Sequence, residues 1–330
     1  MNNMWGSMAQ FEAIYWSWPI VLYLFLAGLS AGSVMVALLV KWNRHENNTR
    51  SIWDAMVKAG ALIGPIAICI GLFLLIADLG KPFTFYILLI KYNFLSVMSL
   101  GVLFLLIYTP FAFLFAIIIF EKEIENSKIL AFLKPVTKFI RSFSGIAKKM
   151  EYILFILAIC VGIYTGFLLS AVAKLPLWNT PILPILFLLS GFSSGIAANI
   201  LIGMWFFKGS LNKDSIKYLL MLDLRAIFFE IPILFILFIG MYFEGGISAV
   251  AASQALNHEY FGKILWIGVI GIGLIVPIII AATALKNHVY KPTFIVLNSL
   301  VVLVGVVLLR YYIVYAGQIC IGAEIENFTS

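Results

Sequence analysis

Two acidic side chains and an arginine interrupt one strongly apolar stretch, LLMLDLRAIFFEIPILF (219–235). Asp223 and Glu230 are seven residues apart, which puts them on one face of a helix, and Arg225 lies nearby. A charged side chain in hydrocarbon costs at least about 2.5–3.5 kcal/mol, so such residues are functional candidates by default. Their spacing along one helix suits a proton path. A buried network of structural charge pairs is the competing interpretation.

Further polar and aromatic residues gather near one set of ends of the apolar stretches. Aromatic walls with a tyrosine or carboxylate that exchanges protons would suit a flat ring carrying two carbonyl oxygens. Aromatic residues at such ends also form ordinary interfacial belts, which is the alternative. The candidates for contact with the ring are Trp18, Tyr23, Asp78, Lys81 and Tyr164, and a further polar cluster is predicted from Lys174, Arg310 and Tyr312.

The elements that must position these residues are membrane helices. Of the 330 residues 63% are hydrophobic and 11% are charged, and the mean hydropathy is +1.07. This composition lies outside the range of soluble domains. About twenty apolar residues cross a bilayer, and we predict an all-α integral membrane protein. The eight predicted transmembrane helices cover residues 16–41, 59–79, 94–120, 151–173, 181–207, 216–243, 262–285 and 294–316.

The basic residues predict how these helices are oriented. The connections that follow the odd-numbered helices hold 16 Lys/Arg, against 4 in those that follow helices 2, 4 and 6. Basic connections stay in the cytoplasm, so both termini are expected on the outer, periplasmic side. The net charge of +7 therefore indicates membrane orientation and not nucleic-acid binding. A basic amphipathic segment near 127–145 is expected to lie on cytoplasmic membrane lipid.

An internal repeat divides the chain. The sequence AGLSAG at 27–32 returns as SGFSSG at 190–195, and prolines at 65 and 110 recur 167 residues later. We therefore predict two four-helix bundles, residues 1–173 and 174–330, that form one membrane unit as a parallel repeat. The glycines four apart allow close helix packing, which is their minimal interpretation.

The chain lacks the motifs of a bound redox centre. Its three cysteines are far apart, and none of its three histidines falls within a predicted helix. We therefore expect no iron–sulfur cluster, haem or metal on this chain. Any electrons it handles must come from, or go to, a mobile molecule or another subunit.

Five ordered segments carry a resemblance to a known family: YLFLAGLSAG (23–32), DLGKPFTF (78–85), YTGFLLSA (164–171), NTPILPILFLLSGFSSG (179–195) and RYYIVYAGQ (310–318). They resemble the NrfD/PsrC family, the quinone-reactive membrane subunits of bacterial respiratory complexes. The resemblance runs from the first helix to the last. It implies eight helices in two bundles in the bacterial inner membrane. It also implies exchangeable menaquinone or menaquinol as the bound redox molecule.

The resemblance also implies partners and residue roles. The partners are a periplasmic subunit with four iron–sulfur clusters and a molybdopterin catalytic subunit or a multihaem nitrite reductase. Tyr23 and Tyr164 match quinone contacts, and Asp223 and Glu230 match acidic positions of the sixth helix. Many relatives have histidine where this chain has Asp78, which puts the protonation chemistry at that position in question.

We therefore predict a menaquinol-oxidising oxidoreductase subunit that is active within its complex. It would pass electrons to the periplasmic iron–sulfur subunit and lose protons through or near Asp78, with possible proton translocation along Asp223 and Glu230. Two alternatives remain open from the residues. One is a secondary transporter, since a parallel repeat with charged residues in the membrane would suit it. The other is a purely structural anchor for the reductase.

Overall fold

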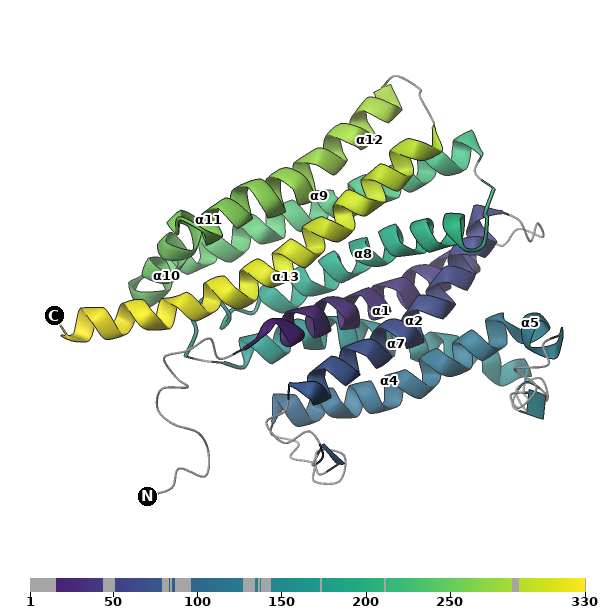
Figure 1. Cartoon of the computed structure of the whole chain (residues 1–330), viewed down its shortest axis with the longest axis horizontal. Helices are drawn as coiled ribbons and strands as arrows, with labels where there is room; N and C mark the ends of the chain where they lie inside the picture. Colours follow the sequence, from purple (N-terminus) through teal and green to yellow (C-terminus); the bar gives the residue numbers. More distant parts are fainter. Residues whose placement is uncertain are drawn as a thin grey trace.

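The computed structural model, shown in Figure 1, covers most of the chain. For residues 144–147 and 320–329 it describes the backbone alone. The residues described are 16–43, 51–78, 83, 85–86, 96–126, 134–135, 137, 144–172, 174–210, 212–286 and 291–329.

Within these residues eight helices are long and apolar enough to cross a membrane, which confirms the predicted fold class. One span is composite, because a π-helix, η4 (Ile264–Ile275), runs directly into α12 (Val276–Lys286). The other seven are α1 (Trp18–Asn43), α2 (Ile52–Ala77), α4 (Val97–Ile119), α7 (Ser144–Ser170), α8 (Leu183–Trp205), α9 (Lys213–Glu244) and α13 (Pro292–Thr329).

Predicted and observed helix bounds differ most at the end of α13, which reaches Thr329 instead of the expected 316. The α2 helix begins seven residues before the expected 59. Ser51 caps this helix, and its side chain accepts a hydrogen bond from the Asp54 amide. The charged Asp54 and Lys58 fall in the first turns of α2, ahead of the apolar run that hydropathy detects. The composite span begins with the short helix α11 (Phe261–Lys263), and the short helices outside the spans are α5 (Glu121–Asn126) and α10 (Gly246–Asn257).

The α10 helix was not predicted. The chain enters it through Gly245 and Gly246, which have φ angles of 74° and 53°. Glycine adopts this left-handed backbone without steric cost. The segment near 127–145, predicted to be amphipathic, falls almost wholly outside the described residues. The predicted division between residues 173 and 174 falls in the connection between α7 and α8.

The repeated glycines pack the two halves of the chain against each other. A Cβ on Gly32 would collide with the Gly191 carbonyl, and one on Gly195 would collide with the main chain at Gly32. Gly28 faces Gly191 in the same way. Equivalent glycines of the two repeats thus meet along one seam between α1 and α8. This contact is the one expected of a parallel repeat whose axis runs along the helices.

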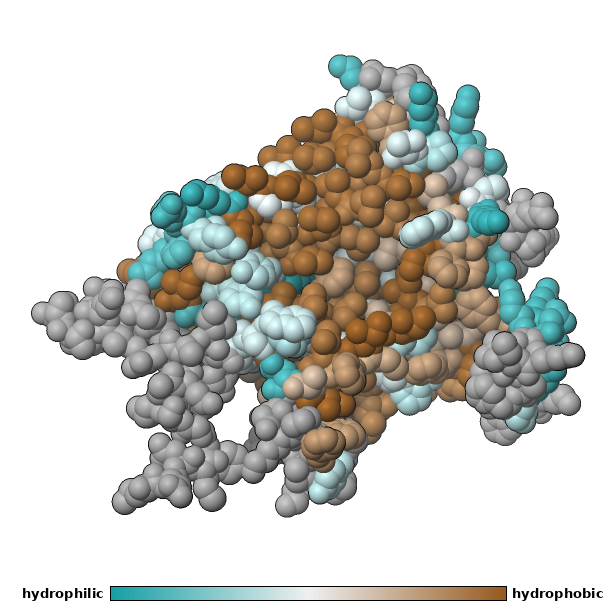
Figure 2. Space-filling view, viewed as in Figure 1, coloured by the Kyte–Doolittle hydropathy of each residue, from teal (hydrophilic) through white to brown (hydrophobic). Residues whose placement is uncertain are grey.

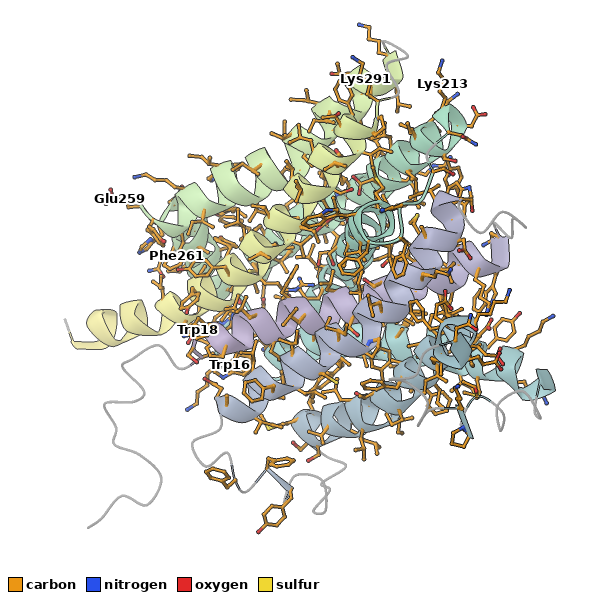
Figure 3. The ribbon with its side chains drawn as sticks, turned by 45° about the vertical axis from the view of Figure 1, so that its right-hand side comes forward. Trp16, Trp18, Lys213, Glu259, Phe261 and Lys291 are labelled. Carbon is orange, nitrogen blue, oxygen red and sulfur yellow. The ribbon has the colours of Figure 1, made fainter. Side chains whose placement is uncertain are left out.

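The two ends of the molecule are distinguished in Figure 3. Trp16 and Trp18 lie near Phe261 and Glu259 at one end, and Lys213 and Lys291 lie at the other. We call them the Trp16 end and the Lys213 end. The charge distribution predicts that the Lys213 end faces the cytoplasm. Figure 2 shows a broad hydrophobic belt between the two more hydrophilic ends, as a multi-pass membrane protein requires.

Specific contacts fix each end. At the Trp16 end, Trp178 donates a 2.7 Å hydrogen bond to the Ile313 carbonyl and its ring lies 4.8 Å from that of Trp16. Toward the Lys213 end, the buried Glu151 carboxylate accepts hydrogen bonds from Lys41, at 2.5 Å, and from the indole of Trp42. The first contact ties the residues just before α1 to the second half, and the second ties the end of α1 to α7 of the first half.

Candidate functional site

Two predicted site residues, Tyr23 of α1 and Tyr164 of α7, lie in the interior of the first half, on helices that pack against each other. Tyr23 is fully buried and Tyr164 is 5% exposed. Tyr23 lies on α1 against Gly71 of α2, whose added Cβ would be 3.4 Å from the Tyr23 ring. Tyr164 lies on α7 directly over Gly101 of α4, where no Cβ could fit. We call Tyr23 and Tyr164 the phenol pair.

The hydroxyl of Tyr23 is buried without a hydrogen-bond partner among the described residues. Buried polar groups are almost always paired, so an orphan of this kind points to a group that binds there. A phenol can donate one hydrogen bond and accept others. The phenol pair can therefore bind an oxygen-bearing ligand in an otherwise apolar setting.

Asp78, the residue that caps α2, lies between this pair and the Trp16 end. Its carboxylate accepts a hydrogen bond from the Ser17 hydroxyl, just before α1 begins. It follows Gly71 by seven residues, or roughly 10 Å along the helix. A carboxylate can accept a proton, and this separation is too long for direct transfer from a group held by the phenol pair.

The other residues predicted at these ends are separated by the structure. Trp18 is 60% exposed, as an interfacial aromatic residue would be. Lys174 is exposed in the connection between α7 and α8, and Lys81 lies outside the described residues. Tyr312 is buried and donates a hydrogen bond to the Ala255 carbonyl of α10. Lys174, Arg310 and Tyr312 therefore do not form one cluster.

Arg310 lies instead in the interior between the two halves. It is fully buried, it donates a 2.9 Å hydrogen bond to the Phe187 carbonyl of α8, and it stacks on the Phe187 ring at 3.6 Å. Its Nη2 atom lies 3.4 Å from the position that a Cβ on Gly28 of α1 would occupy. Its Nε and Nη1 atoms have no hydrogen-bond partner in the described part of the chain. Glu230 is its electrostatic partner.

The two acidic residues of α9 are both buried, as their shared face predicts. Asp223 accepts a hydrogen bond from the Asn298 amide of α13, and Glu230 lies two turns nearer the Trp16 end. Arg225 is exposed on another face of α9. The buried polar line of the second half therefore comprises Asp223, Asn298, Glu230 and Arg310, without Arg225.

Sequence reasoning missed two parts of this arrangement. Asn298 is a polar residue within an apolar helix, and the rule that flagged the acids applies to it in weaker form. Tyr108 of α4 hydrogen-bonds at 2.8 Å to Ser30, which in turn donates to the Gly64 carbonyl at 2.7 Å. Both side chains are fully buried. This chain of hydrogen bonds joins α1, α2 and α4 two turns deeper than the phenol pair.

The repeat shows that the phenol pair belongs to the first half alone. At the offset of 163 that relates the repeated glycines, Tyr23 corresponds to Leu186, which is also fully buried. At the offset of 167, Gly101 corresponds to Gly268, which faces Leu308 instead of a tyrosine. Leucine thus replaces both phenols in the second half. No group of three or more His, Cys, Asp or Glu residues is placed to hold a metal among the described residues.

Comparison with known proteins gives a consistent family. The family model described as "Polysulphide reductase, NrfD" matches residues 6–322. The sequence is 48% identical to the C subunit of the polysulfide reductase of Wolinella succinogenes, over 98% of this protein and all of that subunit. It is 39% identical to the protein NrfD homolog of Haemophilus influenzae, over 93% of this protein and 96% of that one.

A third relative is protein NrfD of Escherichia coli, which is 33% identical over 96% of this protein and 98% of that one. Each match extends over nearly the whole of both sequences. This chain belongs to the NrfD family of polysulphide reductase membrane subunits.

Proposed function

We propose that the chain is the quinol-oxidising subunit of a respiratory reductase complex in the bacterial inner membrane, and that menaquinol is its substrate. The observation that carries this proposal is the buried hydroxyl of Tyr23, which has no partner in the described residues. Family membership supports a role as the membrane subunit of a reductase complex.

The residues present fit a quinol. A naphthoquinol is a flat apolar ring with two hydroxyls, and it supplies two electrons and two protons when bound. Tyr23 and Tyr164 would hydrogen-bond its oxygens, and the Gly71 and Gly101 surfaces let the two tyrosine rings lie against α2 and α4. Because Tyr23 is fully buried, a ring that reaches it must displace neighbouring side chains.

Protons would leave the site toward the Trp16 end. Asp78 and Ser17 are hydrogen-bonded to each other there, and a carboxylate is the natural acceptor. Tyr23 would orient the quinol and exclude water from the ring. In this proposal Asp78 performs the task that histidine performs in many relatives.

Electrons would pass to a peripheral subunit at the same end. The chain has too few cysteines for a cluster of its own. We therefore propose an extrinsic iron–sulfur subunit on the periplasmic side, which passes electrons to a molybdopterin subunit or a multihaem nitrite reductase. Both termini of this chain would face the same compartment.

The test is binding of the quinol-analogue inhibitor HQNO, followed by fluorescence quenching, to the purified chain and to the assembled complex. Saturable quenching near one site per chain is expected, and Tyr23→Phe and Tyr164→Phe should weaken it. Tyr152→Phe is the matched control, because Tyr152 is 58% exposed and stacks on Trp42 at the other end of α7. A folded complex that binds no HQNO would overturn the proposal in favour of a structural anchor.

A second function is favoured by the buried acids. Asp223 and Glu230 form part of a polar line through the second half, which supports proton translocation coupled to quinol oxidation. In liposomes, Glu230→Gln should abolish proton movement and leave quinol oxidation intact. Unchanged proton movement would reject this role. Solute uptake driven by an ion gradient, with no electron-transfer partner, would instead identify a transporter.

A further inference from the structure

The two halves differ in how tightly their first two helices pack. In the first half a Cβ on Gly60 or Gly64 would come within 2.5–2.6 Å of atoms of α1, so α1 and α2 meet along a close seam. At the offset of 167 these positions of α9 are Ile227 and Ile231. The bulkier side chains hold α9 away from α8, and the α8–α9 contact is much sparser than that between α1 and α2.

A buried serine in each half indicates how the looser packing between α8 and α9 affects polar side chains. Ser30 in the first half is satisfied by Tyr108 and by the Gly64 carbonyl. Its repeat equivalent is Ser193, which is 1% exposed and whose hydroxyl has no partner among the described residues. The helix that would supply a tyrosine in the second half, η4, has the sequence ILWIGVIGIGLI and contains no hydroxyl.

Other buried polar atoms of the second half are unpartnered in the same way. They are Oδ1 of Asp223, Oδ1 of Asn298, and Nε and Nη1 of Arg310, in residues that are at most 3% exposed. They come from α9 and α13, the helices that flank the loose contact with α8. Native proteins satisfy such atoms with ordered water when the site is polar and roomy enough.

We propose that the second half binds a chain of ordered water molecules between α8, α9 and α13. Ser193, Asp223, Asn298 and Arg310 are its ligands, and Ser193 and Asn298 thereby become positioning residues beside the two acids. Asp223 and Glu230 are seven residues apart, or roughly 10 Å along the helix. This gap is too wide for direct proton transfer, and a water chain bridges it.

The water site itself depends only on the packing of the second half, whereas its use in proton transfer rests on the proposed function. Radiolytic hydroxyl labelling read by mass spectrometry detects bound water beside buried side chains, and it needs neither quinol nor a partner subunit. Ile227 lies between the two acids on the buried face of α9 and is 1% exposed. Ile68 of α2 is equally buried, at 0%, beside the close seam of the first half.

Labelling of the folded chain in lipid nanodiscs should modify Ile227 several-fold faster than Ile68. The double variant Ser193→Val/Asn298→Leu should lower the Ile227 rate to that of Ile68. Ser194→Ala is the matched control, because the Ser194 hydroxyl bonds its own helix at Gly191 and its loss should change nothing. Equal labelling of Ile227 and Ile68 in the unmodified chain overturns the proposal, whether or not the double variant folds.

The outcome is separable from that of the quinol proposal. If Ile227 is labelled rapidly but HQNO does not bind, the water site stands and the quinol assignment fails. If HQNO binds and Ile227 resists labelling, the reverse holds. Direct protein hydrogen bonds to the unpartnered atoms of the four ligands, seen in a high-resolution structure of the complex, would also overturn the water site.

Discussion

The position of Tyr164 depends on the absence of a side chain at Gly101, and this dependence gives the sharpest test of the phenol pair. A Cβ at Gly101 would lie 1.6 Å from the ζ-carbon of Tyr164. Carbon atoms pack at about 3.5–4.0 Å, so Gly101→Ala must push the ring by roughly 2 Å. A misplacement of about 1 Å at a reacting centre costs on the order of 100-fold in rate. We expect kcat/KM for quinol oxidation to fall by at least that factor.

The assay is oxidation of a soluble naphthoquinol by membranes that hold the complete complex, with the amount of chain matched between variants. Gly71→Ala is the control, since its added methyl group would meet the Tyr23 ring at 3.4 Å, an ordinary contact. That variant should retain activity close to the unmodified protein. The two variants add the same group on neighbouring helices, and only Gly101→Ala displaces a phenol.

A double variant isolates the mechanism. If Gly101→Ala acts through Tyr164, then Gly101→Ala/Tyr164→Phe should be no less active than the weaker single variant, because both changes remove the same interaction. Additive losses would mean that Gly101 serves another purpose. A Gly101→Ala protein with full activity would refute the reasoning outright, since the phenol could then work from a different place.

Three further results are expected. Gly32→Ala should lower the free energy of thermal unfolding of the detergent-solubilised chain by about 1–3 kcal/mol, because its methyl group overlaps a carbonyl of α8. Gly240→Ala is the control and should leave stability unchanged, since its methyl group would meet only the Ile182 side chain, at 3.8 Å. Arg310→Met should lower the free energy of unfolding by about 3–5 kcal/mol, because it leaves Glu230 buried without its cationic partner. The double variant Arg310→Met/Glu230→Gln should recover much of that loss in the same thermal measurement. Asp78→Asn should lower kcat for quinol oxidation by about 100-fold or more with little change in KM, and full activity would exclude Asp78 as the proton acceptor.

The helices could be predicted because crossing a membrane leaves a long apolar run, whatever the run packs against. The glycines of the repeat likewise predicted close packing. The choice of partner was not in the pattern, because a GxxxG face fits any similar face. That Gly32 meets the backbone at Gly191 and Gly195 is therefore information that only the folded chain supplies.

For the candidate site, the sequence predicted how deep in the membrane a residue lies better than it predicted where its side chain points. Tyr23 and Tyr164 were expected to contact a quinone near the outer ends of their helices, and both are buried in the first half. Arg310 was expected among interfacial polar groups, yet its side chain turns inward over Phe187. Position along a helix follows from counting residues, whereas the direction of one side chain depends on which neighbours leave room. The role of Asn298 could not be predicted from its own helix, because it follows from its hydrogen bond to Asp223 of α9.

The division of polar groups between the halves has a physical reason. Positions equivalent to Asp223 and Glu230 in the first half are Met56 and Ile63, both buried where α2 lies close against α1. A carboxylate there would lose its water and find no cation, which costs several kcal/mol. Phenols tolerate such a dry setting because they are neutral. The repeat thus keeps phenols where the helices are close and acids where they are apart.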